Sequence, residues 1–181
     1  SFFNSFNPAD KRRQLLDTFY INKQGAVVAQ KDITPITRDG VLLKKYMDPV
    51  PPSGRINIPI LRLADVYLIA AEAEVRLNDV TSDAYGYIKA VRDRAGLPDL
   101  TAGLDKQQFI DSVLQERSWE LFGEGDRWYD LTRTNTFLQV IPSAVNSVYP
   151  VRTPQPKNRY FPIPLDEINA NSEIEQNPDW K

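Results

Sequence analysis

The sequence predicts a mainly α-helical fold of helical hairpins, with a small β-hairpin and long irregular loops, in a chain that is incomplete. Two observations predict this class. Apolar residues recur at helical spacing through the middle of the chain, over residues 59–134. The flanking segments, 1–58 and 135–181, contain most of the 14 prolines and have the composition of loops and short strands. We expect all three segments to be parts of one domain.

The first segment predicts strands and loops. Apolar residues at 15–21 and 26–28 flank a short loop that contains glycine, which is the pattern of a β-hairpin. Residues 41–46 form a third candidate strand. Residues 48–54 are rich in proline, which lacks the N–H donor that a helix or a central strand needs. We therefore expect a surface loop there.

The second segment opens with a helix predicted over 60–78. Apolar residues follow one another along it at intervals of three and four, which places them on one face. These residues are Leu61, Ala64, Leu68, Ala71 and Val75. Other positions of this helix, including Ala70 and Ala73, are small enough for another helix to pack very close.

A second helix is predicted from Ser82 to the Gly-Leu-Pro sequence at 96–98, where glycine and then proline stop a helix. The short connection to the first helix requires an antiparallel hairpin. One face of the second helix carries Ala84, Ile88 and Val91. Their offsets are typical of a tetratricopeptide repeat, a unit of about 34 residues.

A third helix is predicted after Asp105, which forms a capping box with Gln108, and it is expected to run to Gly123. Its inner face would carry Ile110, Val113, Leu114, Arg117 and Leu121. Helical hairpins of this kind bury their faces against neighbouring units. One or two of them therefore indicate part of a larger stack, with the missing part on the N-terminal side.

Much of the third segment is predicted to be extended loop because of its prolines, with short ordered pieces between. Within it, residues 161–165 are expected to form an edge strand or a polyproline II segment. Trp180 either docks the C-terminal tail or is exposed. A functional alternative for this segment is a contact with the rim of a partner protein.

Composition excludes several kinds of chemistry. The chain contains neither histidine nor cysteine, so a Ser-His-Asp triad, a thiol nucleophile, an imidazole base, a zinc site of the usual kind and a disulfide are all excluded within it. The formal net charge of −2 gives no basic footprint for nucleic acid. No segment has the spacing of an EF-hand, so we assign no metal and no cofactor.

Five carboxylates gather near the end of the third helix: Glu116, Glu120, Glu124, Asp126 and Asp130. Paired carboxylates are what a glycoside hydrolase needs, one as acid and one as base or nucleophile. The alternation of acidic residues with Arg117, Arg127 and Arg133 favours an ion-pair network instead. Two nearby indoles, Trp119 and Trp128, are expected in the core, with stacking on sugar rings as the alternative.

Four motifs now stand in a defined order along the chain. They are Leu-Arg-Leu-Ala-Asp-Val-Tyr-Leu at 61–68, Arg-Ala-Gly-Leu-Pro at 94–98, Glu-Leu-Phe-Gly-Glu-Gly-Asp-Arg-Trp-Tyr-Asp-Leu at 120–131, and Phe-Pro-Ile-Pro-Leu-Asp at 161–166 followed by Gln-Asn-Pro at 176–178. With them, the sequence resembles the C-terminal region of the SusD/RagB family. The resemblance covers nearly the whole chain from about Asp10.

The resemblance implies a non-catalytic glycan-binding protein with a SusD-like α-α superhelix. Such proteins are lipid-anchored on the outer face of the outer membrane, and they pass oligosaccharides to a TonB-dependent, SusC-like barrel. The lipid anchor, the signal peptide and the rest of the protein would then lie upstream of this chain. The membrane would be reached only through that anchor.

Sugar binding requires exposed aromatic faces together with polar groups that fix hydroxyls. The first segment, residues 1–58, supplies this mixture on or beside loops. The resemblance to the family places ligand binding in this segment but identifies no individual residue. We predict ligand contacts at Tyr20, Tyr46, Asp48, Arg55 and Asn57.

Two other functions remain open from the residues themselves. The first is a tetratricopeptide-like scaffold for protein–protein interaction, which the helical hairpin supports. The second is a glycoside hydrolase that uses the carboxylates of 116–130.

Overall fold

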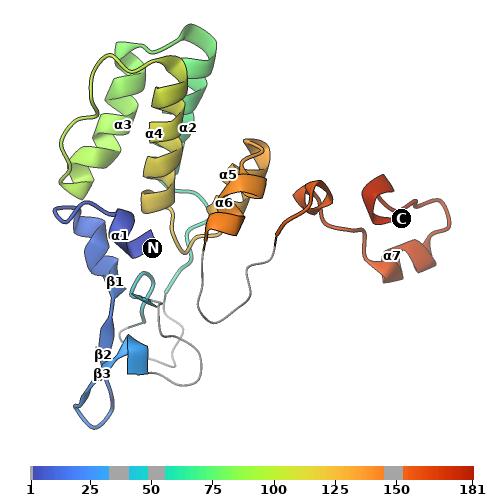
Figure 1. Ribbon diagram of the computed structural model, residues 1–181, viewed down its shortest axis with the longest axis horizontal. Helices are drawn as coiled ribbons and strands as arrows, with labels where there is room; N and C mark the ends of the chain where they lie inside the picture. The colour runs from blue at the N-terminus through green and yellow to red at the C-terminus, as the bar shows by residue number, and fades with distance from the viewer. Residues whose placement is uncertain (1, 33–40, 49–55, 145–152) are drawn as a thin grey trace. The chain divides into compact units, whose positions relative to one another are not determined.

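The computed structural model describes residues 2–32, 41–48, 56–144 and 153–181 (Figure 1). The chain divides into two compact units, Ser1–Asp130 and Leu131–Lys181. Residues 49–54 of the predicted loop at 48–54 lie outside the described residues. Among the residues that are described, no helix is long and apolar enough to cross a membrane.

Three helices form the core of the first unit: α2 (Leu63–Asn78), α3 (Ser82–Ala95) and α4 (Lys106–Glu120), which lie side by side in Figure 1. Each contributes the face that its apolar spacing predicts. The buried cluster consists of Leu68, Ala71, Val75, Ala84, Ile88, Val91, Phe109, Ile110 and Val113. The helical hairpin of α2 and α3 and the third helix are therefore confirmed.

Local signals set the ends of these helices. The Thr81 hydroxyl accepts a hydrogen bond from the Ala84 N–H at 3.2 Å and caps α3. Gly96 ends α3 with φ 76°, as the Gly-Leu-Pro stop predicts. The capping box of Asp105 and Gln108 is present at the start of α4.

Two predicted bounds were wrong by a few residues. The first helix begins at Leu63 rather than at residue 60, because Arg62 is extended at the N-cap (φ −132°, ψ 151°), and Leu61 is exposed instead of facing the core. The third helix ends at Glu120 rather than at Gly123. Gly123 instead adopts φ 76° in the turn that follows, where a Cβ atom would lie only 2.9 Å from Leu43 Cδ2.

The β structure is smaller and differently paired than predicted. Strand β2 (Phe19–Ile21) pairs with β3 (Val27–Ala29) as the expected hairpin, with Ile21 opposite Val27. The predicted first strand does not continue through 15–21, because β1 (Leu16–Asp17) instead pairs antiparallel with β4 (Leu42–Leu43). Of the strand predicted over residues 41–46, only β4 (Leu42–Leu43) forms.

Aromatic rings hold the start of the chain against the end of α4. After helix α1 (Phe2–Ser5), the buried ring of Phe6 lies 6.1 Å from the ring of Trp119 and 5.8 Å from that of Phe122. Such ring pairs are favourable beyond the area they bury. Segments more than 100 positions apart thus meet at one end of the helical core.

The boundary between the two units falls within α5 (Asp126–Arg133). The second unit then contains α6 (Phe137–Ser143) and α7 (Leu165–Ala170). No strand forms over 161–165, since Leu165 starts α7, but Pro164 has φ −53° and ψ 140°, in the polyproline II region. Trp180 docks the tail, because its Nε1 donates to the carbonyl oxygens of Lys157 and Tyr160 at 3.2 and 3.1 Å.

Candidate functional site

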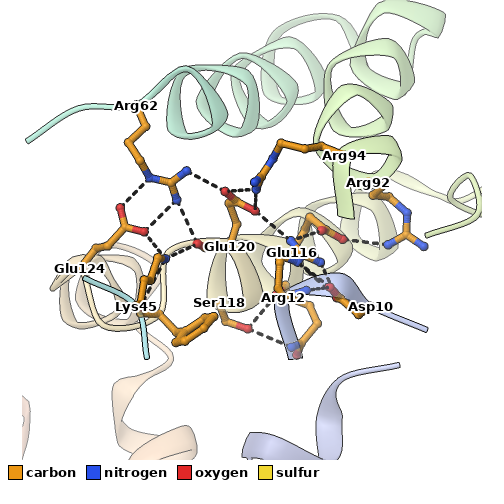
Figure 2. Close-up of polar contacts among 12 residues, drawn as sticks. Asp10, Arg12, Lys45, Arg62, Arg92, Arg94, Glu116, Ser118, Glu120 and Glu124 are labelled. Atoms are coloured by element: carbon orange, nitrogen blue, oxygen red, sulfur yellow. Dashed lines mark hydrogen bonds and ion pairs between the residues drawn. The ribbon is translucent and has the colours of Figure 1, made fainter. Parts of the chain in front are cut away.

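The carboxylates at the end of α4 lie in an ion-pair network, which Figure 2 shows in close-up. Glu116 and Glu120 are one helical turn apart and buried, and Glu124 follows in the turn after the helix. The cations come from distant parts of the chain. They are Arg12, Lys45, Arg62, Arg92 and Arg94.

Arg12 is buried in the middle of this network. Its guanidinium contacts Glu116 Oε1 at 2.7 Å and Glu120 Oε2 at 3.1 Å, and its Nη2 donates to Asp10 Oδ2 at 2.7 Å. Burial by itself would lower the pKa of Arg12, but the hydrogen bond to Asp10 and the charge of Glu116 outweigh burial and raise that pKa. Arg12 therefore stays charged and ties the start of the chain to α4.

Glu120 joins three segments through its carboxylate. Besides Arg12, it accepts hydrogen bonds from Arg62 Nη1 at 2.7 Å and from Arg94 Nη2 at 2.5 Å. Arg62 stands directly before α2, and Arg94 lies in the last turn of α3. One carboxylate thus holds the ends of all three core helices together.

Glu124 pairs with Arg62 and Lys45. Arg62 donates to both of its carboxylate oxygens, at 2.7 and 2.8 Å, and the Lys45 ammonium donates to it as well. Burial would raise the pKa of Glu124, but the hydrogen bonds from Arg62 and Lys45 lower it below its ordinary value. Burial also lowers the pKa of Lys45, despite its bond to Glu124.

A second cluster joins α2, α4 and α5. Arg117 donates from Nη1 to Asp65 Oδ1 at 2.6 Å and from Nε to Asp130 Oδ2 at 2.8 Å, and all three residues are buried. The neighbouring Asp126 has a raised pKa, first because of burial and then because of the negative charge of Asp65.

The predicted network therefore exists, but it also uses cations that were not predicted. Arg117 does neutralise Asp130, whereas the arginines that pair with Glu116, Glu120 and Glu124 come from outside 117–133. The sequence did contain a signal at Arg62. A cation directly before a helix is unfavourable with the helix dipole, which indicates that Arg62 is there to pair with a carboxylate. Trp119 and Trp128 are half-buried, not fully in the core as expected.

The predicted ligand contacts do not gather around one strand pair. Tyr20 lies in β2 and is exposed, and Tyr46 follows β4 and is half-buried. Because β1 and β4 are antiparallel, the chain leaves their ladder toward Tyr20 at one end and toward Tyr46 at the other. Asp48 is half-buried, Asn57 is exposed, and Arg55 lies outside the described residues. All five stay predictions.

Tyr46 has a backbone conformation that Tyr20, Asp48 and Asn57 do not share. Its φ of 64° lies in the left-handed region, which is uncommon for a large side chain and is a form of strain that clusters at functional sites. The Lys45 ammonium lies 5.9 Å from the centre of the Tyr46 ring. Burial, and then the charge of Glu124, raise the pKa of the phenol. Tyr46 therefore adjoins the ion-pair network.

The family model of the SusD family matches residues 14–180. The chain belongs to the SusD family. This match confirms the predicted resemblance. The similarity of this structure to a solved glycan-binding protein confirms the predicted mainly helical, superhelical fold class.

Relatives of this SusD family member are similar to it over only part of their length. SusD-like protein P25 of Formosa agariphila is 40% identical over 119 residues, which are 64% of this chain and 22% of that protein. Starch-binding protein SusD of Bacteroides thetaiotaomicron is 34% identical over 136 residues, which are 69% and 22% of the two chains. Surface glycan-binding protein A of Bacteroides uniformis superposes with a TM-score of 0.72 at 27% identity, over 97% of this chain and 39% of that one.

Because the pKa of Glu124 is lowered, the contribution of this residue to the stability of this SusD family member should depend on pH. A carboxyl group whose pKa is depressed by folding stabilises the fold above its unfolded pKa of about 4.3, and this contribution is lost as the pH falls through the folded pKa. We expect Glu124→Gln to reduce stability at pH 7 and to have progressively less effect below about pH 4. Urea unfolding at pH 7, 5 and 3 measures this.

The control is Glu175→Gln, which removes an exposed ion pair with Lys181 at 2.7 Å. It is expected to leave stability unchanged at each pH. An effect of Glu124→Gln that is the same at pH 3 as at pH 7 would contradict the assignment.

Proposed function

We propose that this protein is a non-catalytic glycan-binding protein of the cell surface that delivers its ligand to a TonB-dependent, SusC-like outer-membrane transporter. The observation that carries the proposal is the match to the SusD family over residues 14–180. A starch-binding protein and a surface glycan-binding protein are among the relatives it resembles. A lipid anchor on sequence outside these residues would hold the protein at the outer membrane.

The carboxylates of α4 support a binding role over catalysis. Glycoside hydrolysis needs one carboxyl that carries a proton and a second that reaches the sugar or a water molecule. Glu116 and Glu120 are 0% and 2% exposed and are enclosed by arginines, so a sugar does not reach them. Glu124, with its lowered pKa, is poorly suited to donate a proton.

Tyr46 is the predicted ligand contact that the structure supports most. It combines a strained backbone with a position next to the half-buried Lys45 ammonium, and an aromatic ring of this kind can cover the C–H face of a pyranose. Tyr20 offers a second ring, exposed on a two-stranded sheet. Asp48, Asn57 and Arg55 would fix hydroxyl groups.

The test is retention of the protein, with its flanking sequence restored, on a panel of insoluble or immobilised polysaccharides, together with an assay for released reducing ends. We expect retention on one class of glycan and no new reducing ends. Tyr46→Ala is expected to weaken that binding by about tenfold, the loss of a contact worth roughly 1.4 kcal/mol.

The matched control is Tyr160→Ala, an exposed tyrosine outside the predicted zone that is expected to bind like the parent. Variants Tyr20→Ala and Tyr46→Ala that fold by circular dichroism and both bind like the parent would refute the site. Release of reducing ends would overturn the non-catalytic role. Affinity for a peptide or protein with none for glycans would select the tetratricopeptide-like scaffold.

A further inference from the structure

Tyr46 occupies an unusual position in a tight turn. The Met47 N–H donates to the Lys44 carbonyl oxygen at 3.2 Å, which closes a β-turn over residues 44–47 with Tyr46 at its third position. A positive φ at this position is normally taken by glycine or asparagine, because other side chains are strained there. A tyrosine stays in this conformation only when the surrounding contacts fix the turn.

The β1–β4 ladder fixes the turn on one side. Leu43 pairs with Leu16 in this ladder. The Lys44 N–H then donates to the Leu15 carbonyl oxygen at 2.8 Å. The Lys44 ammonium also contacts Asp17 Oδ2 at 2.8 Å, although both side chains are partly exposed. The backbone therefore enters the turn at a defined place.

The ammonium of Lys45 fixes the turn on the other side. Its three N–H donors match three acceptors at and just after the end of α4. These are the carbonyl oxygens of Glu120 at 2.8 Å and Phe122 at 3.2 Å, and the Glu124 carboxylate. A cation is favourable at the C-terminus of a helix, where carbonyl oxygens lack partners. The Lys45 side chain therefore ties the turn to the end of α4 (Figure 2).

The Tyr46 ring lies beside this anchor. The Lys45 ammonium is 4.6 Å from the centre of the Phe122 ring and 5.9 Å from that of Tyr46. Glu124 also acts on the Tyr46 phenol, because burial and then the charge of Glu124 raise the pKa of that phenol. Both observations place the ring next to the pair of Lys45 and Glu124.

From these contacts we propose that Lys45 is a positioning residue of the glycan site, which holds the turn at 44–47 so that the Tyr46 ring is presented to the ligand. The proposal rests on the proposed function, in which this ring covers a sugar. Lys45 acts through Tyr46 rather than on the ligand, since its three donors are already bound at the end of α4. A ring that is fixed before binding removes the entropic cost of ordering it on binding.

The first test is independent of the ligand and follows the Tyr46 phenol by NMR. The protein, with its flanking sequence restored, carries isotope-labelled tyrosine, and Tyr46→Phe assigns the signal. In Lys45→Met we expect the ring to leave Glu124 and its buried position, so the phenol pKa falls toward its ordinary value of about 10. If Lys45 supplied only a positive charge beside a fixed ring, its loss would raise that pKa. A phenol pKa that rises or stays unchanged would therefore overturn the proposal.

The matched control is Lys44→Met in the same turn. It removes the partly exposed pair with Asp17 and leaves the anchor on α4 intact, so the phenol pKa and glycan binding are expected to stay as in the parent. Lys45→Arg keeps the charge and the reach to α4 and is expected to preserve most of the effect of Lys45. If Lys45→Met does not fold by circular dichroism, Lys45→Gln replaces it, with the same direction expected for both readouts.

The second test measures glycan binding. On the glycan that retains the parent, Lys45→Met is expected to weaken binding by about tenfold, as Tyr46→Ala does, and the double variant is expected to bind no more weakly than Tyr46→Ala alone. A further loss in the double variant would overturn the proposal, because Lys45 would then act apart from Tyr46. If Tyr46→Ala binds like the parent, the proposed ligand contact fails, whereas a fall of the phenol pKa in Lys45→Met still supports the positioning of the ring by Lys45.

Discussion

Replacing Arg12 with alanine is expected to lower the free energy of unfolding by about 3 to 5 kcal/mol. The substitution leaves Asp10 and Glu116, which are 2% and 0% exposed, with a buried charge and without the guanidinium that contacts both. In the wild type, neither carboxylate is accessible to water. Urea unfolding of the wild type and Arg12→Ala at pH 7 measures the difference.

The matched control is Gln14→Ala, an exposed residue in the same 3₁₀ turn, which is expected to change stability by less than about 0.5 kcal/mol. Arg12→Lys separates charge from geometry. A lysine restores one positive charge but not the planar fork that serves Asp10 and Glu116 together, so only part of the stability is expected to return. A loss below about 1 kcal/mol for Arg12→Ala would contradict a buried network and match an exposed ion pair.

Local periodicity predicted the helical core because each helix carries its own signal. The spacing of Leu68, Ala71 and Val75 and the cap at Asp105 depend only on neighbours in sequence. The predicted end of a helix was wrong where the residue next to it pairs with a residue far away in the sequence. Arg62 precedes α2 in an extended conformation and pairs with Glu120 and Glu124, and no pattern within residues 60–78 identifies those two partners.

Long-range pairing explains the misjudged strands in the same way. Residues 15–21 look like one strand, because β-propensity does not reveal which partner each part takes. The structure divides the segment between β4, some 25 positions away, and the local hairpin strand β3. Gly123 shows the same coupling of distant segments, because a Cβ atom at this position would lie only 2.9 Å from Leu43 Cδ2.

The sequence predicted what kind of site this is, but not which residues form it. Regular alternation of acidic and basic residues predicted an ion-pair network, and such a network exists. Its cations Arg12 and Lys45 lie 108 and 79 positions from their carboxylate partners Glu120 and Glu124, beyond the reach of any local motif. The strained backbone of Tyr46 likewise depends on the three-dimensional setting. Glycine or asparagine would have indicated a left-handed conformation in the sequence, but this position is a tyrosine.

The cluster of Asp65, Arg117 and Asp130 yields the second large effect, expected for Arg117→Met. Arg117 lies between two carboxylates that are 8% and 3% exposed, on α2 and α5. Its removal leaves two buried negative charges facing the space that a cation occupied, so we expect a loss of about 3 to 5 kcal/mol in the free energy of unfolding. Methionine fills much of the volume of the arginine stem, which limits the contribution of a cavity.

A triple variant distinguishes the effect of the two carboxylate charges from that of the lost contacts. In Asp65→Asn, Arg117→Met and Asp130→Asn combined, the two carboxylates become neutral groups of the same shape. Because breaking a buried ion pair costs more than removing all of its charges, we expect the triple variant to be more stable than Arg117→Met alone by at least about 1 kcal/mol. A triple variant less stable than the single one would show that each contact contributes separately.

Asp126 supplies a local readout that a general loss of packing does not predict. In the wild type, burial and the charge of Asp65 raise the pKa of Asp126, and the charge of Arg117 opposes them. Arg117→Met is therefore expected to raise the pKa of Asp126 further, whereas the triple variant, which also loses the charge of Asp65, is expected to bring it back down. Carboxyl titration followed by NMR distinguishes these two directions, and it tests whether the cluster joins α2, α4 and α5 by charge.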